Sequence, residues 1–114
     1  MDPELSEIGG ALRDAVTLFF VPLQTSRQID EAAFRALHGE GLRLVRACKG
    51  REDVPKALLK ELLVAYSILR NEAPYFGDKT SILEDMANKL ESCFRLIISD
   101  EVPEDRQPGV PRII

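Results

Sequence analysis

Four stretches of this chain repeat apolar side chains every three or four residues, and this spacing most limits the fold that the chain can adopt. Residues at that spacing share one face of an α-helix, so each stretch can bury one stripe and leave its other faces to water. No stretch alternates apolar and polar residues as a half-buried β-strand does. The pattern predicts an all-α protein with helices over residues 3–22, 31–49, 54–73 and 81–99.

Residues with known capping preferences mark the ends of these helices. Asp30 and Asp53 stand where a carboxylate can accept hydrogen bonds from the free amides of a first helical turn. Ser81 and Glu84 have the spacing of a capping box, in which each side chain bonds the other's backbone amide. Pro22 has no amide hydrogen, and we expect it to end the first helix.

The connections between the helices are short, which favours antiparallel neighbours. We therefore expect one domain, an antiparallel four-helix bundle over residues 1–99. A proline-containing C-terminal arm over residues 100–114 is expected to pack on the bundle or on a partner. Gly41 lies in the middle of the second apolar stripe, where it predicts a close approach between helices.

Charge and cysteine content narrow the class of protein. A net charge of −4 over 114 residues argues against a nucleic-acid-binding surface, which needs excess positive charge. No apolar run has the length of a membrane span, and the acidic start is unlike a secretory signal. Cys48 and Cys93 fall on apolar stripes, where a reduced thiol packs as a small hydrophobic group. We expect a cytoplasmic protein that does not enter a membrane.

The sequence indicates no catalytic, metal or cofactor site. His38 is the only histidine, and no spacing joins it to an orienting carboxylate or a nucleophile. Its position at the edge of an apolar stripe predicts a ring packed on the border of the core. No Cys-x-x-Cys pair and no glycine-rich phosphate loop is present.

Three segments carry more apolar residues than a single bundle core needs. The third helix is apolar around most of its circumference, with Val64 and Ile68 about 100° from its main stripe. Tyr75 and Phe76 lie in a loop, where they can anchor a partner or cover the end of the core. The arm closes on Val-Pro-Arg-Ile-Ile. The expected partner-binding residues are Val64, Ile68, Tyr75, Phe76, Val110, Ile113 and Ile114.

Basic residues gather on the outer face of the second helix and in the turn that follows it. Arg43, Arg46 and Arg51 can form an anion-binding site there, or they can pair with neighbouring acids on a solvated face. The leading hypothesis is a small protein-binding module with a regulatory, inhibitory or immunity-like role, which binds another protein, itself as a homodimer, or both. The alternative is a binder of a small anionic ligand, such as a nucleotide, through these arginines.

Overall fold

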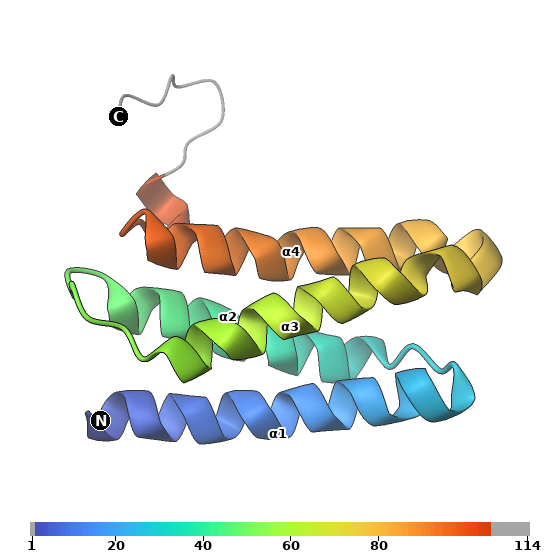
Figure 1. Ribbon diagram of the computed structural model, residues 1–114, viewed down its shortest axis with the longest axis horizontal. Coiled ribbons are helices and arrows are strands. Elements are labelled where there is room, and N and C mark those ends of the chain that lie inside the picture. The colour runs from blue at the N-terminus through green and yellow to red at the C-terminus, as the bar shows by residue number, and fades with distance from the viewer. Residues whose placement is uncertain (1, 106–114) are drawn as a thin grey trace.

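The chain folds into four α-helices, and the computed structural model describes residues 2–105 (Figure 1). The α-helices are α1 (Pro3–Ser26), α2 (Glu31–Cys48), α3 (Lys56–Glu72) and α4 (Thr80–Ile98). Two 3-10 helices complete the described chain, η1 (Ala73–Lys79) and η2 (Pro103–Asp105). The prediction of an all-α four-helix bundle is confirmed. None of the helices in residues 2–105 combines the length and apolarity that crossing a membrane would require.

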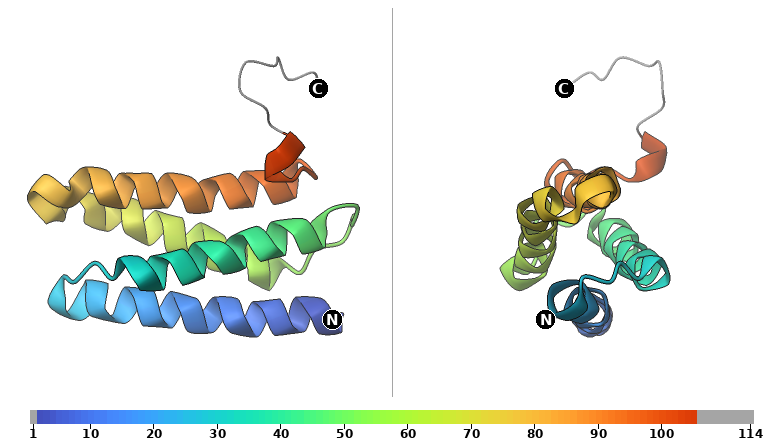
Figure 2. Two further views of the ribbon diagram at one scale, coloured as in Figure 1. Left: turned by 180° about the vertical axis from the view of Figure 1, so that it is seen from behind. Right: turned by 90° about the vertical axis from the view of Figure 1, so that its right-hand side faces the viewer.

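The bundle consists of two antiparallel helix pairs, α1 with α2 and α3 with α4 (Figure 2). The pairs stack so that α2 packs along α4 and α1 packs more loosely along α3. Successive helices alternate in direction, so α2 and α4 run parallel to each other. Antiparallel contact was expected between all consecutive helices, but α2 and α3 lie diagonally across the bundle. The connection over residues 49–55 is long enough to make this crossing, since an extended chain spans about 3.3 Å per residue.

The core is apolar throughout the described chain, with no buried polar or charged side chain. Phe19 is fully buried, and its ring meets Phe20 at 5.0 Å and Phe34 at 5.4 Å between centroids. Gly41 brings α2 close to α4, because a Cβ atom there would lie 3.2 Å from the Sγ of Cys93. The predicted role of Gly41 in close helix packing is therefore confirmed.

The prediction that Pro22 ends the first helix is wrong, because α1 continues to Ser26 with Pro22 inside it. Proline removes the amide that would bond the carbonyl of Leu18, four residues earlier. Leu18 is on the exposed side of the helix, where water can take that carbonyl. Burial of Leu23 beyond the proline keeps the last turn packed on the core. The helix ends at Ser26, and the next residue, Arg27, adopts a left-handed conformation with φ 55°.

The predicted N-terminal cap is confirmed for α2 and is wrong for α3 and α4. Asp30 caps α2 as predicted and accepts a hydrogen bond of 3.0 Å from the amide of Ala33. The residue before α3 is Pro55 rather than Asp53, and it makes no side-chain cap. The predicted capping box at Ser81 and Glu84 is also wrong.

The reason for the missing capping box is that η1 leads directly into α4. The amide of Thr80 already donates to the carbonyl of Gly77 in η1, and the Thr80 hydroxyl donates to the carbonyl of Ala73 at 2.6 Å. Gly77 has φ 57°, a left-handed conformation that suits glycine in this reversal between α3 and α4. Ser81 then lies inside the helix, and Glu84 is free to bond a residue of α3.

Candidate protein-docking surface

Apolar side chains of two neighbouring helices are exposed on the outer side of the α3–α4 pair. Tyr66 of α3 and Phe94 of α4 meet edge to face, with ring centroids 6.0 Å apart and an interplanar angle of 70°. Both rings are half-buried against the core. Leu63 is one turn before Tyr66, and Ile98 is one turn after Phe94. Because α3 and α4 are antiparallel, Leu63 and Ile98 lie level with each other beyond the two rings.

Leu63 and Ile98 are far more exposed than the core residues beside them, at 42% and 63% of their surface. Ile97 is buried, so the second isoleucine of this pair is directed outward. Leu59, one turn earlier on α3, is half-buried on the same side of the helix. We call this surface the α3–α4 face, and it consists of Leu59, Leu63, Tyr66, Phe94 and Ile98.

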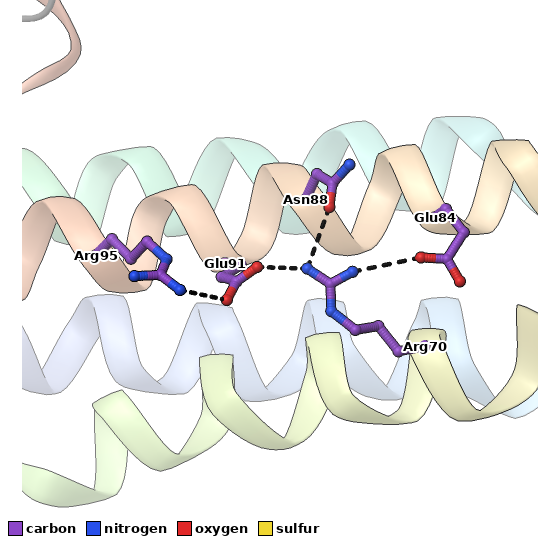
Figure 3. A network of polar contacts seen from close by, with 5 residues as sticks. All are labelled: Arg70, Glu84, Asn88, Glu91 and Arg95. Carbon is purple, nitrogen blue, oxygen red and sulfur yellow. Dashed lines mark hydrogen bonds and ion pairs between the residues drawn. The ribbon is translucent and has the colours of Figure 1, made fainter.

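A network of charged side chains borders the α3–α4 face. The guanidinium of Arg70 lies 5.8 Å from the centre of the Tyr66 ring. It donates hydrogen bonds to Asn88 at 3.1 Å and to the carboxylate of Glu91. Figure 3 shows the complete network, which contains Arg70, Glu84, Asn88, Glu91 and Arg95.

Glu91 is the centre of this network, since it accepts hydrogen bonds from Arg70 and from Arg95. Partial burial acts to raise the pKa of Glu91, but the hydrogen bonds from the two arginines outweigh it and lower that pKa. Partly exposed ion pairs of this kind contribute about 1 kcal/mol or less to stability. Their structural effect is to hold Arg70 over Tyr66, so that a polar rim surrounds one end of an apolar surface.

The structure separates the two predicted residues of α3. Val64 is 43% exposed, as a partner-binding residue should be. Ile68 is half-buried and packs against the core, so much of its surface is already covered within the chain. At about 100° per residue, neither shares the side of α3 that carries Leu63 and Tyr66.

The two predicted aromatic residues of η1 also differ from each other. Phe76 is half-buried against the core, and the guanidinium of Arg27 lies 5.7 Å from its ring centre. Tyr75 is exposed, while its carbonyl accepts a hydrogen bond of 3.1 Å from Arg27. Phe76 thus covers the end of the core, and Tyr75 is available at the surface.

Each arginine of the predicted anion-binding site already has a carboxylate partner in the described chain. Arg43 pairs with Glu7 at 2.6 Å and with Glu40 at 3.3 Å. Arg46 pairs with Glu104 at 2.7 Å, and Arg51 pairs with Asp2 at 3.2 Å. An anionic ligand would therefore have to displace these acids. Anion binding by Arg43, Arg46 and Arg51 stays a prediction.

The other chemically notable side chains pack within the fold. His38 is half-buried at the border of the core and stacks on Phe34 with centroids 6.0 Å apart. Burial, and to a lesser degree the charge of Lys89, lowers the pKa of His38. Cys48 and Cys93 are free and buried, and burial raises the pKa of the Cys93 thiol to about 11.

Several exposed apolar residues were not among the predicted contacts. Leu63 was visible as part of the apolar excess of α3, but the sequence did not show which side of that helix would be covered. Ile98 had a weaker signal, a second isoleucine where the stripe of α4 needs only Ile97. Leu18 and Val21 of α1 are also exposed. The predicted arm residues Val110, Ile113 and Ile114 lie outside the described residues.

Comparison with known proteins gives no relative for this chain: no protein-family model matches it, and no curated protein or solved structure shows a significant match.

Proposed function

We propose that this chain is a protein-binding module with a regulatory or inhibitory role, and that the α3–α4 face is its principal docking surface. The observation that carries the proposal is the side-by-side exposure of Leu63 and Ile98 next to the Tyr66–Phe94 ring pair. Exposed aliphatic groups scattered singly need no partner, but a contiguous apolar surface on two helices gains free energy when it is covered.

The composition of the α3–α4 face also supports a protein partner. Tyrosine and phenylalanine are enriched at the centres of protein interfaces, because a rigid ring buries much area with little loss of conformational entropy. Arg70 at the rim has a side chain that is 32% exposed, and it can exchange its present partners for those of a docked protein. A helix or hairpin of another protein fits such a surface, and a second copy of this chain is the other candidate partner.

The two cysteines support a proposal about the compartment in which the module works. Cys48 and Cys93 are both free and belong to different helices. Proteins that keep unpaired thiols are typical of reducing compartments. We accordingly place the module in the cytoplasm.

The test compares two matched double variants of the full chain in capture experiments from the native cell. Leu63→Lys with Ile98→Lys places two charges on the α3–α4 face. Leu18→Lys with Val21→Lys places two charges on an exposed part of α1, as the control. Both variants should fold, because all four positions are exposed, and charge at exposed sites changes stability by about 0.5 kcal/mol.

We expect the first variant to lose a protein that the wild type and the control both retain. If the partner is a second copy, light scattering should show a wild-type dimer that becomes a monomer in the first variant alone. A monomeric wild type that captures the same proteins as both variants would remove the α3–α4 face as a docking surface.

A further inference from the structure

A second surface, separate from the α3–α4 face, is a groove of about 430 Å³ between the parallel helices α2 and α4. Leu42 of α2 and Leu96 of α4 supply apolar groups to it. His38, Arg46 and Lys89 supply its polar and charged groups. Pro103 of η2 lines one end. The groove thus combines an apolar lining with two fixed positive charges and an imidazole.

The chain's own segment 100–105 is bound at that end of the groove. Glu104 pairs with Arg46 at 2.7 Å, and Asp105 pairs with Lys49 at 3.5 Å. Val102 lies between α4 and these acids in the sequence, and its side chain packs against the core. This surface therefore holds a peptide segment in two ways. Its cations bind the carboxylates of the segment, and the bundle packs against the segment's apolar side chains.

Backbone contacts anchor the first residue of the segment more firmly than the last ones. The Oδ1 atom of Asp100 accepts a hydrogen bond of 2.7 Å from the amide of Gly50, and its carbonyl accepts one of 2.6 Å from Lys49 Nζ. Glu104 and Asp105 are instead held to Arg46 and Lys49 by side-chain ion pairs whose members are 42–66% exposed. Exposed ion pairs contribute little and weaken with salt, so η2 can leave its place while Asp100 stays bound.

The remaining charges of the groove favour a carboxylate-bearing ligand. Among residues 2–105, Lys89 forms its ion pair along its own helix, with Asp85 at 3.2 Å, and both side chains are about half exposed or more. His38 gains a stabilising partner for its protonated form if a carboxylate docks beside it. Leu96 is buried in the core, so Leu42, which is half-buried, is the leucine of the groove that a ligand can cover. An inorganic anion would use the charged groups but leave Leu42 uncovered, whereas an acidic peptide with apolar residues would use both.

We propose that the α2–α4 groove binds an acidic, apolar peptide segment of a partner protein, and that residues 102–105 act as an internal competitor at its Arg46 end. The partner segment displaces Glu104 from Arg46 and places an apolar side chain against the half-buried Leu42. The internal competitor lowers the apparent affinity by the fraction of molecules in which it is bound. This proposal does not depend on the α3–α4 face.

The experiment uses the full chain labelled with ¹⁵N and a capped synthetic hexapeptide with the sequence of residues 100–105, Asp-Glu-Val-Pro-Glu-Asp. Glu104→Gln with Asp105→Asn removes both ion pairs of η2 and changes none of the residues of α2 and α4 that line the groove. We expect the peptide to shift the amide resonances around Leu42, Lys89 and Leu96 in this double variant at millimolar concentration. If the internal competitor is bound in about nine molecules out of ten, the wild type should bind about tenfold more weakly.

A third substitution tests whether the peptide binds through Arg46. Arg46→Gln in the double variant should abolish the shifts, whereas Lys60→Gln, on an exposed position of α3, should leave them intact. Thermal unfolding and resonance dispersion show that each variant is folded.

Three outcomes would overturn the proposal. The first is the absence of shifts in every variant. The second is that sodium phosphate alone reproduces the peptide's shifts, which would make the groove a simple anion site. The third is that the same resonances shift with protein concentration when no peptide is present, which would make the groove a contact between copies of this chain.

Discussion

Gly41 on α2 faces the thiol of Cys93 on α4 so closely that a methyl group added at Gly41 would lie 3.2 Å from Sγ. The same methyl group would lie 3.6 Å from Leu62, so a buried leucine of α3 limits the space on another side. This contact is one of those that join the two antiparallel pairs of the bundle, because α2 and α4 belong to different pairs.

The first prediction follows from that contact. Gly41→Ala should lower the free energy of unfolding by about 1 kcal/mol, since overpacking costs about 1–3 kcal/mol and the helix propensity of alanine returns about 1 kcal/mol. Gly39→Ala, with open space around its Cβ position, should raise stability by up to about 1 kcal/mol. Urea unfolding of both variants measures the difference. Equal stabilisation by both changes would show that the Cys93 side chain can shift to make room for the added methyl group without a loss of stability.

The second prediction concerns the two residues of α3 that the sequence placed together. Ile68→Lys should destabilise the protein by about 1–3 kcal/mol, because its side chain packs against the core. Val64→Lys should change stability by about 0.5 kcal/mol or less, because Val64 is exposed. Thermal unfolding of the two single variants checks this, and similar melting temperatures would contradict the assigned burial.

The third prediction uses the pKa of Glu91, which lies below its ordinary value of 4.5. A carboxyl group with a lowered pKa in the folded state stabilises the protein above its unfolded pKa, and this stabilisation is lost as pH falls through the folded pKa. Arg70→Met should cost about 1 kcal/mol near neutral pH, and the cost should shrink as pH falls below about 4.

Unfolding of the wild type and of Arg70→Met at several pH values measures this cost directly. Lys89→Met is the matched control, since within the described part of the chain Lys89 pairs with Asp85 along α4 and not across the helix pair. A cost for Arg70→Met that stays constant down to pH 3 would show that Glu91 is not the group involved.

The fourth prediction concerns thiol reactivity. Burial and a pKa of about 11 keep the Cys93 thiol protonated and shielded, and burial also raises the pKa of Cys48. Iodoacetamide should therefore modify neither residue at an appreciable rate in the folded protein, and both should react in denaturant. During long exposure of the folded protein to the reagent, Cys48 at the end of α2 should react before Cys93, because helix ends open more readily than helix centres. Mass spectrometry with peptide mapping gives the order, and prior modification of Cys93 would contradict the described packing.

The sequence by itself determined the local features of this protein. The apolar spacing was enough to predict four helices, because each helix can be stable in the fold only if its apolar stripe is buried. The cap at Asp30 could also be predicted, because capping involves residues close together in the chain.

Tertiary structure decided what depends on contacts between distant residues. Packing on the core carried α1 past Pro22, although the local preference of proline is to stop a helix. The direct passage of η1 into α4 removed the need for a cap at Ser81. Whether Leu63 or Ile68 is exposed depends on which neighbour covers each side of α3, and helical periodicity places residues on a face without saying what lies against it. The pairing of Arg46 with Glu104 joins positions far apart in the chain, so only the folded arrangement could show that the basic face of α2 is already occupied.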